Sequence, residues 1–241
     1  MDFLRALVKK LNVQPTDVVV EVGTGAGTLT QALAATGCQI HSIEIDQRLQ
    51  PHLTQTLQPY QNVQLLFGDA LQHDFGNLPP FRLIANVPDY ITTPLIMQFL
   101  ALPNCRELNV LVADEVAERI VATPGTAIYG ALSVTCQLQA ECHILQTVPR
   151  TLFTPQPKVD SAFVCLKKNG APYDFELGKL LKAIFAARRK TMLNALSGAL
   201  NIDKTVAAQI LEAAGIAPTL RPEQITPTQF AKISANSRNF C

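Results

Sequence analysis

Residues 17–27 read Asp-Val-Val-Val-Glu-Val-Gly-Thr-Gly-Ala-Gly, and this stretch decides the fold. A run of β-branched residues is typical of a strand in a parallel sheet that is covered on both faces. The three glycines that follow permit a tight turn and a close approach of the backbone to a ligand. The stretch therefore predicts a buried strand, a ligand-binding turn and the start of a helix.

The same alternation of strand and helix extends outward from this stretch. An opening helix is expected at 3–11, and Gly37 ends the helix after the glycine turn. Further strands are expected at 39–45, 63–67, 82–86, 108–113 and 161–166, with helices at 47–57, 93–101 and 115–122. This order predicts an α/β fold with a doubly wound, mostly parallel sheet.

Beyond Asn169-Gly-Ala-Pro172 the pattern changes to helices alone. They are expected at about 175–187, 190–199, 203–213 and 227–236. We therefore predict two domains, one at 1–168 that contains the sheet and a small helical one at 169–241.

The composition supports a folded chain with an uneven charge distribution. The 241 residues are 48% hydrophobic and 16% charged, which excludes disorder and low-complexity architectures. The net charge is +1, but residues 1–168 hold 11 Lys and Arg against 14 Asp and Glu, whereas residues 169–241 hold 9 against 5. Taken alone, the basic tail is explained by a solvated helical surface better than by a polyanion partner.

The six cysteines indicate neither a disulfide scaffold nor a metal site. No Cys-x-x-Cys pair is present, and Cys142-His143 has no partner at ligand spacing. The sequence also shows no signal peptide and no apolar stretch of the roughly 20 residues that span a membrane. We therefore expect a cytoplasmic protein with no metal and no membrane contact.

The spacing of the glycines favours S-adenosylmethionine as the ligand. The loop reads Gly-x-Gly-x-Gly, with Thr28 where the dinucleotide fingerprint has its third glycine. A dinucleotide pyrophosphate needs the helix N-terminus, whereas S-adenosylmethionine has no phosphate. Gly23 and Gly25 are the expected backbone contacts, and a glycine turn without a ligand is the alternative.

Acidic residues at the ends of the next two strands strengthen this interpretation. Open α/β sheets bind ligands at the carboxyl ends of their strands. Glu44 or Asp46 can accept both ribose hydroxyls, and Glu44 is favoured because Asp46 can instead cap the following helix. Asp69 can accept from the adenine amino group, although a turn or cap role is equally open to it.

The fourth strand leads into Asn86-Val-Pro-Asp-Tyr-Ile-Thr-Thr-Pro94, where the sequence resembles the rRNA adenine N6,N6-dimethyltransferases. The resemblance covers nearly the whole chain. It also includes Glu21–Thr30, Glu115–Arg119, Pro124–Thr126, Tyr129–Ser133, Phe153–Ser161 and Ala187–Leu196.

The resemblance implies a Rossmann-like methyltransferase sheet and a monomeric enzyme of ribosome biogenesis. Such an enzyme uses S-adenosylmethionine to methylate two adjacent adenosines near the 3′ end of small-subunit rRNA, in a pre-ribosomal particle. Methylation of large-subunit RNA or DNA would use the same loop chemistry, and a dehydrogenase is the least favoured alternative.

The chemistry expected of this loop is positioning rather than strong base catalysis. An exocyclic adenine amine is a poor nucleophile because its lone pair is delocalised into the ring. The Asn86 side chain and the Val87-Pro88 backbone supply oxygens that can each accept one N–H. Such acceptors favour a pyramidal nitrogen aimed at the methyl group.

Asp89 is the chief departure from the family pattern. By the resemblance, the target base lies between an aromatic at this position and Phe153, after leaving its RNA stack. A carboxylate cannot replace the stacking surface, and Tyr90 is the neighbouring aromatic. An inactive RNA-binding assembly factor of the same fold is therefore the alternative function.

The basic residues acquire a role through the same resemblance. Lys158, Arg188, Arg189 and Lys190 are expected to neutralise RNA phosphates, so that 169–241 becomes an RNA-binding domain. Lys158 can instead be a structural partner of Asp160, and the other three can form a solvated helix start. The family also opens with a basic segment and a Gly-Gln-x-Phe-Leu motif, whereas Met1 lies within the helix after it.

Overall fold

The valine-rich strand lies at the centre of a seven-stranded sheet in the computed structural model, which describes residues 2–153 and 156–238. The strands are β1 (Val18–Val22), β2 (Gln39–Glu44), β3 (Val63–Phe67), β4 (Phe81–Asn86), β5 (Cys105–Ala113), β6 (Ala140–Val148) and β7 (Ser161–Lys168). Their order across the sheet is β3-β2-β1-β4-β5-β7-β6. Five strands from β3 to β5 pair in parallel, and β7 pairs with β5 in antiparallel orientation. The predicted doubly wound, mostly parallel sheet is confirmed.

The sheet topology places a crevice beside β1. The chain runs outward from β1 to β2 and β3, then returns to pair β4 on the other side of β1. At such a reversal the connections leave in opposite directions and open a crevice at the carboxyl ends of the strands. Glu21 pairs in register with Ser42 of β2 and with Ile84 of β4, so the three strand ends lie together.

The helices agree with the expected pattern in number and order except at two places. They are α1 (Asp2–Leu11), α2 (Thr28–Ala34), α3 (Gln50–Leu57), α4 (Asp89–Ala101), α5 (Asp114–Val121), α6 (Ala131–Gln139), α7 (Phe175–Ala186), α8 (Met192–Leu200), α9 (Lys204–Ala213) and α10 (Pro227–Ser237), with 3₁₀ turns η1 (Gln47–Leu49), η2 (Arg150–Leu152) and η3 (Pro222–Gln224). The sequence pattern did not predict α6 or β6, and it placed the start of α4 at residue 93. In the part of the chain that the structure describes, no helix has the length and apolar character of a membrane span.

The chain divides into two units, and the second is built from two separate segments. The first unit contains 1–117 and 143–170, and the second contains 118–142 and 171–241. The sequence placed the boundary between 168 and 169, close to the point after residue 170 where the chain enters the second unit for the second time. It did not assign 118–142 to the helical part of the chain.

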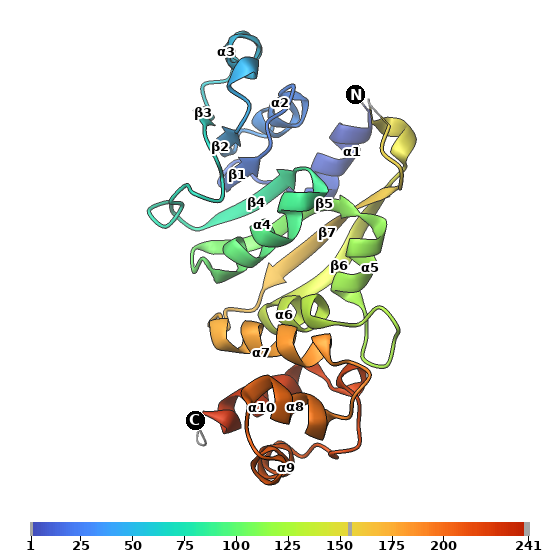
Figure 1. Ribbon diagram of the computed structural model, residues 1–241. Helices are drawn as coiled ribbons and strands as arrows, with labels where there is room; N and C mark the ends of the chain where they lie inside the picture. The colour runs from blue at the N-terminus through green and yellow to red at the C-terminus, as the bar shows by residue number, and fades with distance from the viewer. Residues whose placement is uncertain (1, 154–155, 239–241) are drawn as a thin grey trace. The chain divides into compact units, whose positions relative to one another are not determined.

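Each unit has its own hydrophobic core. In the first, α1 and α2 pack together over the sheet (Figure 1) and share a cluster that includes Leu7, Leu33 and Val19. Helix α4 packs on β5, and its Phe99 lies among the aromatic rings of Phe75 and Phe81. The core of the second unit combines side chains of α6 to α10.

Candidate active site

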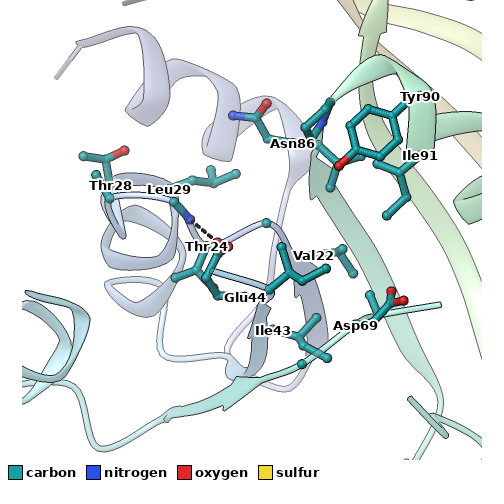
Figure 2. A pocket seen from close by; sticks show the side chains of 18 residues that line it. Val22, Thr24, Thr28, Leu29, Ile43, Glu44, Asp69, Asn86, Tyr90 and Ile91 are labelled. Atoms are coloured by element: carbon teal, nitrogen blue, oxygen red, sulfur yellow. Dashed lines mark hydrogen bonds between the residues drawn. The ribbon is translucent and has the colours of Figure 1, made fainter. Parts of the chain in front are cut away.

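A cavity of about 320 Å³ lies at the carboxyl ends of β1, β2 and β4 (Figure 2). Its walls come from the glycine loop, the ends of β2 and β3, and the turn after β4. Of the residues predicted to bind cofactor or substrate, the lining includes Gly23, Gly25, Glu44, Asp69, Asn86, Pro88 and Tyr90. Residues far apart in the sequence therefore converge on one cavity.

The glycine loop presents its backbone to the cavity. Gly25 has φ +55°, and no atom lies within 4 Å of the position that a Cβ would take there. Its N–H donates to Glu44 Oε2 at 2.9 Å, and the N–H of Gly23 donates to Ile43 O at 3.0 Å. A ligand can therefore approach the loop closely while β2 holds the loop in position.

Glu44 and Asp46 have separate roles. Glu44 is 7% exposed, and its Oε1 accepts from the Asp46 N–H at 2.8 Å. Asp46 caps η1 and forms an ion pair with Arg48 at 2.7 Å, and hydrogen bonds from Arg48 lower the pKa of Asp46 to about 2. Glu44 lines the cavity, whereas Asp46 does not.

Asp69 combines the two roles that its sequence position left open. Its Oδ1 accepts from the Leu71 N–H at 2.9 Å, and its Oδ2 accepts from Gln72 Nε2 at 3.0 Å. These bonds stabilise the turn after β3. The same carboxylate also lines the cavity, opposite the end of β4 (Figure 2).

The turn after β4 places Tyr90, and not Asp89, at the cavity. Asn86 ends β4, Pro88 is the N-cap of α4, and Asp89 is the first helical residue. Tyr90 is 82% exposed and lines the cavity, whereas Asp89 is exposed and is not among the lining residues. Figure 2 shows the Tyr90 ring at the rim beside Ile91 and on the same side as Asn86.

Phe153 lies elsewhere in the first unit. It is half-buried against the cluster formed by α1, α2 and the sheet, and it does not line the cavity. Thr154 and Pro155 of the same motif lie outside the described residues.

Lys158 is exposed and is not the partner of Asp160. Arg150 Nη1 donates to Lys158 O at 3.0 Å, and Asp160 Oδ1 accepts from the Arg150 N–H at 2.9 Å. The alternative that paired Lys158 with Asp160 is therefore wrong. Asp160 stabilises the start of η2, and the Lys158 side chain has no ion-pair partner within residues 2–153 and 156–238.

The three basic residues of the second unit occupy the turn between α7 and α8, not a helix start. Arg189 and Lys190 are exposed. Arg188 is half-buried, donates to Ala127 O at 2.9 Å and lies 3.8 Å from Glu223 Oε2. Arg188 is therefore engaged inside the second unit, whereas its two neighbours face solvent.

Two features of the site were not predicted from the sequence. Ile45 is 64% exposed and lines the cavity. In the sequence, the only sign of this role was an apolar residue placed between Glu44 and Asp46. Glu21 is completely buried beneath the glycine loop, and its signal was an acid inside a valine run. Among the described residues no group of His, Cys, Asp and Glu could hold a metal ion.

Comparison with protein families gives one match over almost the whole chain. The family described as "Ribosomal RNA adenine dimethylase" matches residues 2–236. The "Ribosomal RNA small subunit methyltransferase A" of Alkaliphilus metalliredigens is 40% identical over 248 residues, which cover 97% of this chain and 86% of that protein.

Two solved structures share the fold. A dimethyladenosine transferase from Plasmodium falciparum is 23% identical with a TM-score of 0.86, covering 99% of this chain and 96% of that chain. The 23S rRNA methyltransferase ErmE is 22% identical with a TM-score of 0.74, covering 98% of this chain and 96% of that chain. At these identities the similarity establishes the fold alone.

Proposed function

The chain belongs to the ribosomal RNA adenine dimethylase family, and we propose that it dimethylates two adjacent adenosines near the 3′ end of small-subunit rRNA. This makes it an S-adenosylmethionine-dependent rRNA (adenine-N6,N6-)-dimethyltransferase of ribosome biogenesis. The observation that carries the proposal is the convergence of Glu44, Asn86 and Tyr90 on one cavity.

The cavity fits the methyl donor of this family. Its volume of about 320 Å³ is in the range of small-molecule sites, and its walls are largely apolar with a few polar groups. S-Adenosylmethionine supplies a methyl group activated by a sulfonium. Glu44 would hold the ribose hydroxyls, Asp69 the adenine amino group, and the backbone at Gly23 and Gly25 would contact the donor closely.

Asn86 and the Val87-Pro88 backbone prepare the target amine. The Asn86 amide oxygen accepts one N–H of the amine, and a backbone carbonyl beside Pro88 accepts the other. These bonds hold the nitrogen lone pair toward the methyl group, and they stabilise the positive charge that develops as nitrogen is alkylated. Asn86 ends β4 on the cavity, which supports this assignment.

Tyr90 supplies the flat surface for the flipped adenine in place of an aromatic at Asp89. Its exposure of 82% leaves the ring face available, and its position at the cavity brings a stacked base close to Asn86. Stacking on an aromatic ring contributes about 1–3 kcal/mol per base. Phe153 is assigned to the second surface only by the family resemblance.

The second unit is proposed to bind the RNA. Arg189 and Lys190 are exposed and can neutralise phosphates, and Lys158 of the first unit can do the same. The partner is then small-subunit rRNA in a pre-ribosomal particle. We propose that the enzyme acts in the cytoplasm and as a monomer.

The inactive assembly factor is not favoured. The Alkaliphilus protein, and others of the same name at 38–40% identity, align with 97% of this chain. Because Tyr90 lines the cavity, a stacking aromatic is present despite Asp89.

The test is methyl transfer from labelled S-adenosylmethionine to unmethylated small-subunit particles. We expect two methyl groups on each of two adjacent adenosines, and none with Asn86→Ala. Large-subunit particles and DNA serve as competing substrates. Methylation of either in preference to the small subunit would overturn the substrate assignment, and donor binding without transfer would restore the inactive alternative.

A further inference from the structure

Glu21 is a completely buried carboxyl group directly behind the glycine loop. It is the fourth residue of β1 and has no exposed surface. Its Oε2 accepts hydrogen bonds from Thr30 Oγ1 of α2 and from Ser42 Oγ of β2, each at 2.6 Å. Its Oε1 is buried without a hydrogen-bond partner among the described residues.

These contacts determine which hydroxyl group is the donor in each hydrogen bond that leads from Glu21 to the cavity. A serine hydroxyl has one proton to donate. Ser42 donates it to Glu21, so in the 2.7 Å pair between Thr24 Oγ1 and Ser42 Oγ the donor is Thr24. With its own proton engaged, the Thr24 hydroxyl has only oxygen lone pairs left to offer to the cavity that it lines.

The oxygen lone pairs of Thr24, linked through Ser42 to the carboxylate of Glu21, favour binding of a cation. S-Adenosylmethionine is cationic at its sulfonium and at its α-ammonium group, whereas the product S-adenosylhomocysteine retains only the ammonium. We propose that Glu21 is a positioning residue: through Ser42 it turns Thr24 into an acceptor for the cationic part of the donor, and its carboxylate charge strengthens donor binding. This inference rests on the proposed function.

The environment of Glu21 places its ionisation in the neutral range. Burial is the main cause that raises the pKa of Glu21, and the charge of Glu44 raises it as well. Hydrogen bonds from Ser42 and Thr30 lower it, and the net pKa is about 7. The charged group that affects the pKa of Glu21 is Glu44 of β2. The neighbouring residues on the other two elements are uncharged: Thr30 on α2 donates a hydrogen bond to Glu21, and Ile84 on β4 pairs with it in register. A bound cation lowers this pKa, so donor affinity must rise with pH as Glu21 loses its proton.

Calorimetric titration of the full chain from about pH 6 to about pH 8 tests the coupling. We expect S-adenosylmethionine to bind about fivefold more tightly at the upper end, the rise over this range if donor binding lowers the pKa of Glu21 by about one unit. S-Adenosylhomocysteine should show a smaller rise. Glu21→Gln retains an acceptor oxygen but cannot ionise, so its profile should be flat. A flat profile in the wild type, or an unchanged rise in Glu21→Gln, would overturn the inference.

Two neighbouring variants keep the test decisive if Glu21→Gln does not fold. Ser42→Ala breaks the link between Glu21 and Thr24, and we expect weaker donor binding throughout the pH range. Thr30→Val removes the other hydrogen bond to Glu21 without touching Thr24. It should retain the pH-dependent rise with its midpoint at higher pH, because Thr30 lowers the pKa of Glu21. Equal effects of the two substitutions on donor affinity would contradict the proposal.

The same titration separates this inference from the proposed function. Donor binding of equal strength at every pH would overturn the role of Glu21 alone. Absence of donor binding at every pH would overturn the proposed function and this inference with it.

Discussion

Gly23 lies directly against the backbone carbonyl of Asn86: a Cβ built on Gly23 would lie 2.5 Å from that oxygen and 3.2 Å from Cγ1 of Val87. The missing side chain is therefore what allows the glycine loop and the end of β4 to meet. A residue expected to contact the cofactor also determines where the proposed catalytic asparagine lies.

Gly23→Ala should lower kcat roughly 100-fold, because the Asn86 carbonyl must move away from the new methyl group and misplaces the amide. Single-turnover methylation of small-subunit particles measures the chemical step. Calorimetric titration with S-adenosylmethionine shows how much of the loss comes from donor binding.

Gly37→Ala is the matched control for backbone strain. Gly37 has φ +85°, close to the +86° of Gly23, but its Cβ would meet Pro15 Cβ at an ordinary 3.5 Å. We expect a loss of stability with kcat retained. An equal fall in kcat for both variants would show that backbone strain, and not contact with Asn86, is responsible.

Tyr90→Ala should lower kcat/KM for the particle, with a loss of transition-state stabilisation of about 1–3 kcal/mol, the contribution of one stacked base. Tyr90→Phe retains the ring and should remain close to wild type. Asp89→Ala is the adjacent control and should have a smaller effect, because Asp89 does not line the cavity. A larger loss for Asp89→Ala than for Tyr90→Ala would reverse the assignment.

Glu44→Gln should weaken S-adenosylmethionine binding by about 1–3 kcal/mol, because an amide group would face the N–H of Gly25 or of Asp46 as a second donor. The Kd is measured by calorimetry. Asp46→Asn, next to it but engaged with Arg48, should bind the donor nearly as the wild type does. A stronger effect at Asp46 would favour the alternative ribose ligand.

Arg189→Gln and Lys190→Gln should each reduce the slope of log K against log salt for particle binding by about 1, as expected for one phosphate contact. Arg188→Gln should instead lower the melting temperature, because its bonds to Ala127 and Glu223 lie within the second unit. Filter binding over a salt series provides the slopes. Unchanged slopes for both exposed residues would remove this turn from the RNA interface.

The free energy of unfolding of the ligand-free protein should carry a contribution from Glu21 that falls as pH rises from about 4.5 to about 7. In this interval the folded state holds a proton that the unfolded state has lost, so raising the pH favours unfolding by about 3 kcal/mol in total. Urea denaturation of wild type and Glu21→Gln across this range isolates the contribution. A difference between the two proteins that stays constant with pH would contradict the raised pKa.

The fold was largely predictable because its strands are marked by apolar runs and its turns by glycine. Residues 131–148 were missed because a mostly apolar helix passes directly into a strand without a turn residue: Ala140, which caps α6, is the first residue of β6. Pro94 was misleading as well, since proline usually lies in the first turn of a helix, whereas here it lies inside α4.

The convergence of the glycine loop and the strand-end acids on one cavity was predictable, but the positions of Asp89 and Phe153 outside it were not. Glycines and acids at strand ends converge because parallel strands end on the same edge of a sheet, which the sequence pattern implies. Whether Asp89 or Tyr90 faces the cavity depends on the residue at which α4 begins. Pro88 is the N-cap and therefore sets that starting point. Phe153 packs against a core whose shape depends on α1 and α2, which local sequence does not reveal.

The two-segment construction of the second unit has a consequence for synthesis of the chain. Tyr129 is completely buried, its hydroxyl donates to Ile225 O at 2.8 Å, and its ring contacts Phe185. It joins Ile184 and Phe230 in one core, and its hydrogen-bond partner Ile225 is translated 96 residues after it. A chain that stops after residue 170 leaves this tyrosine without its core. During synthesis, residues 118–142 can therefore pack into their native core only after residues 171–241 have been made.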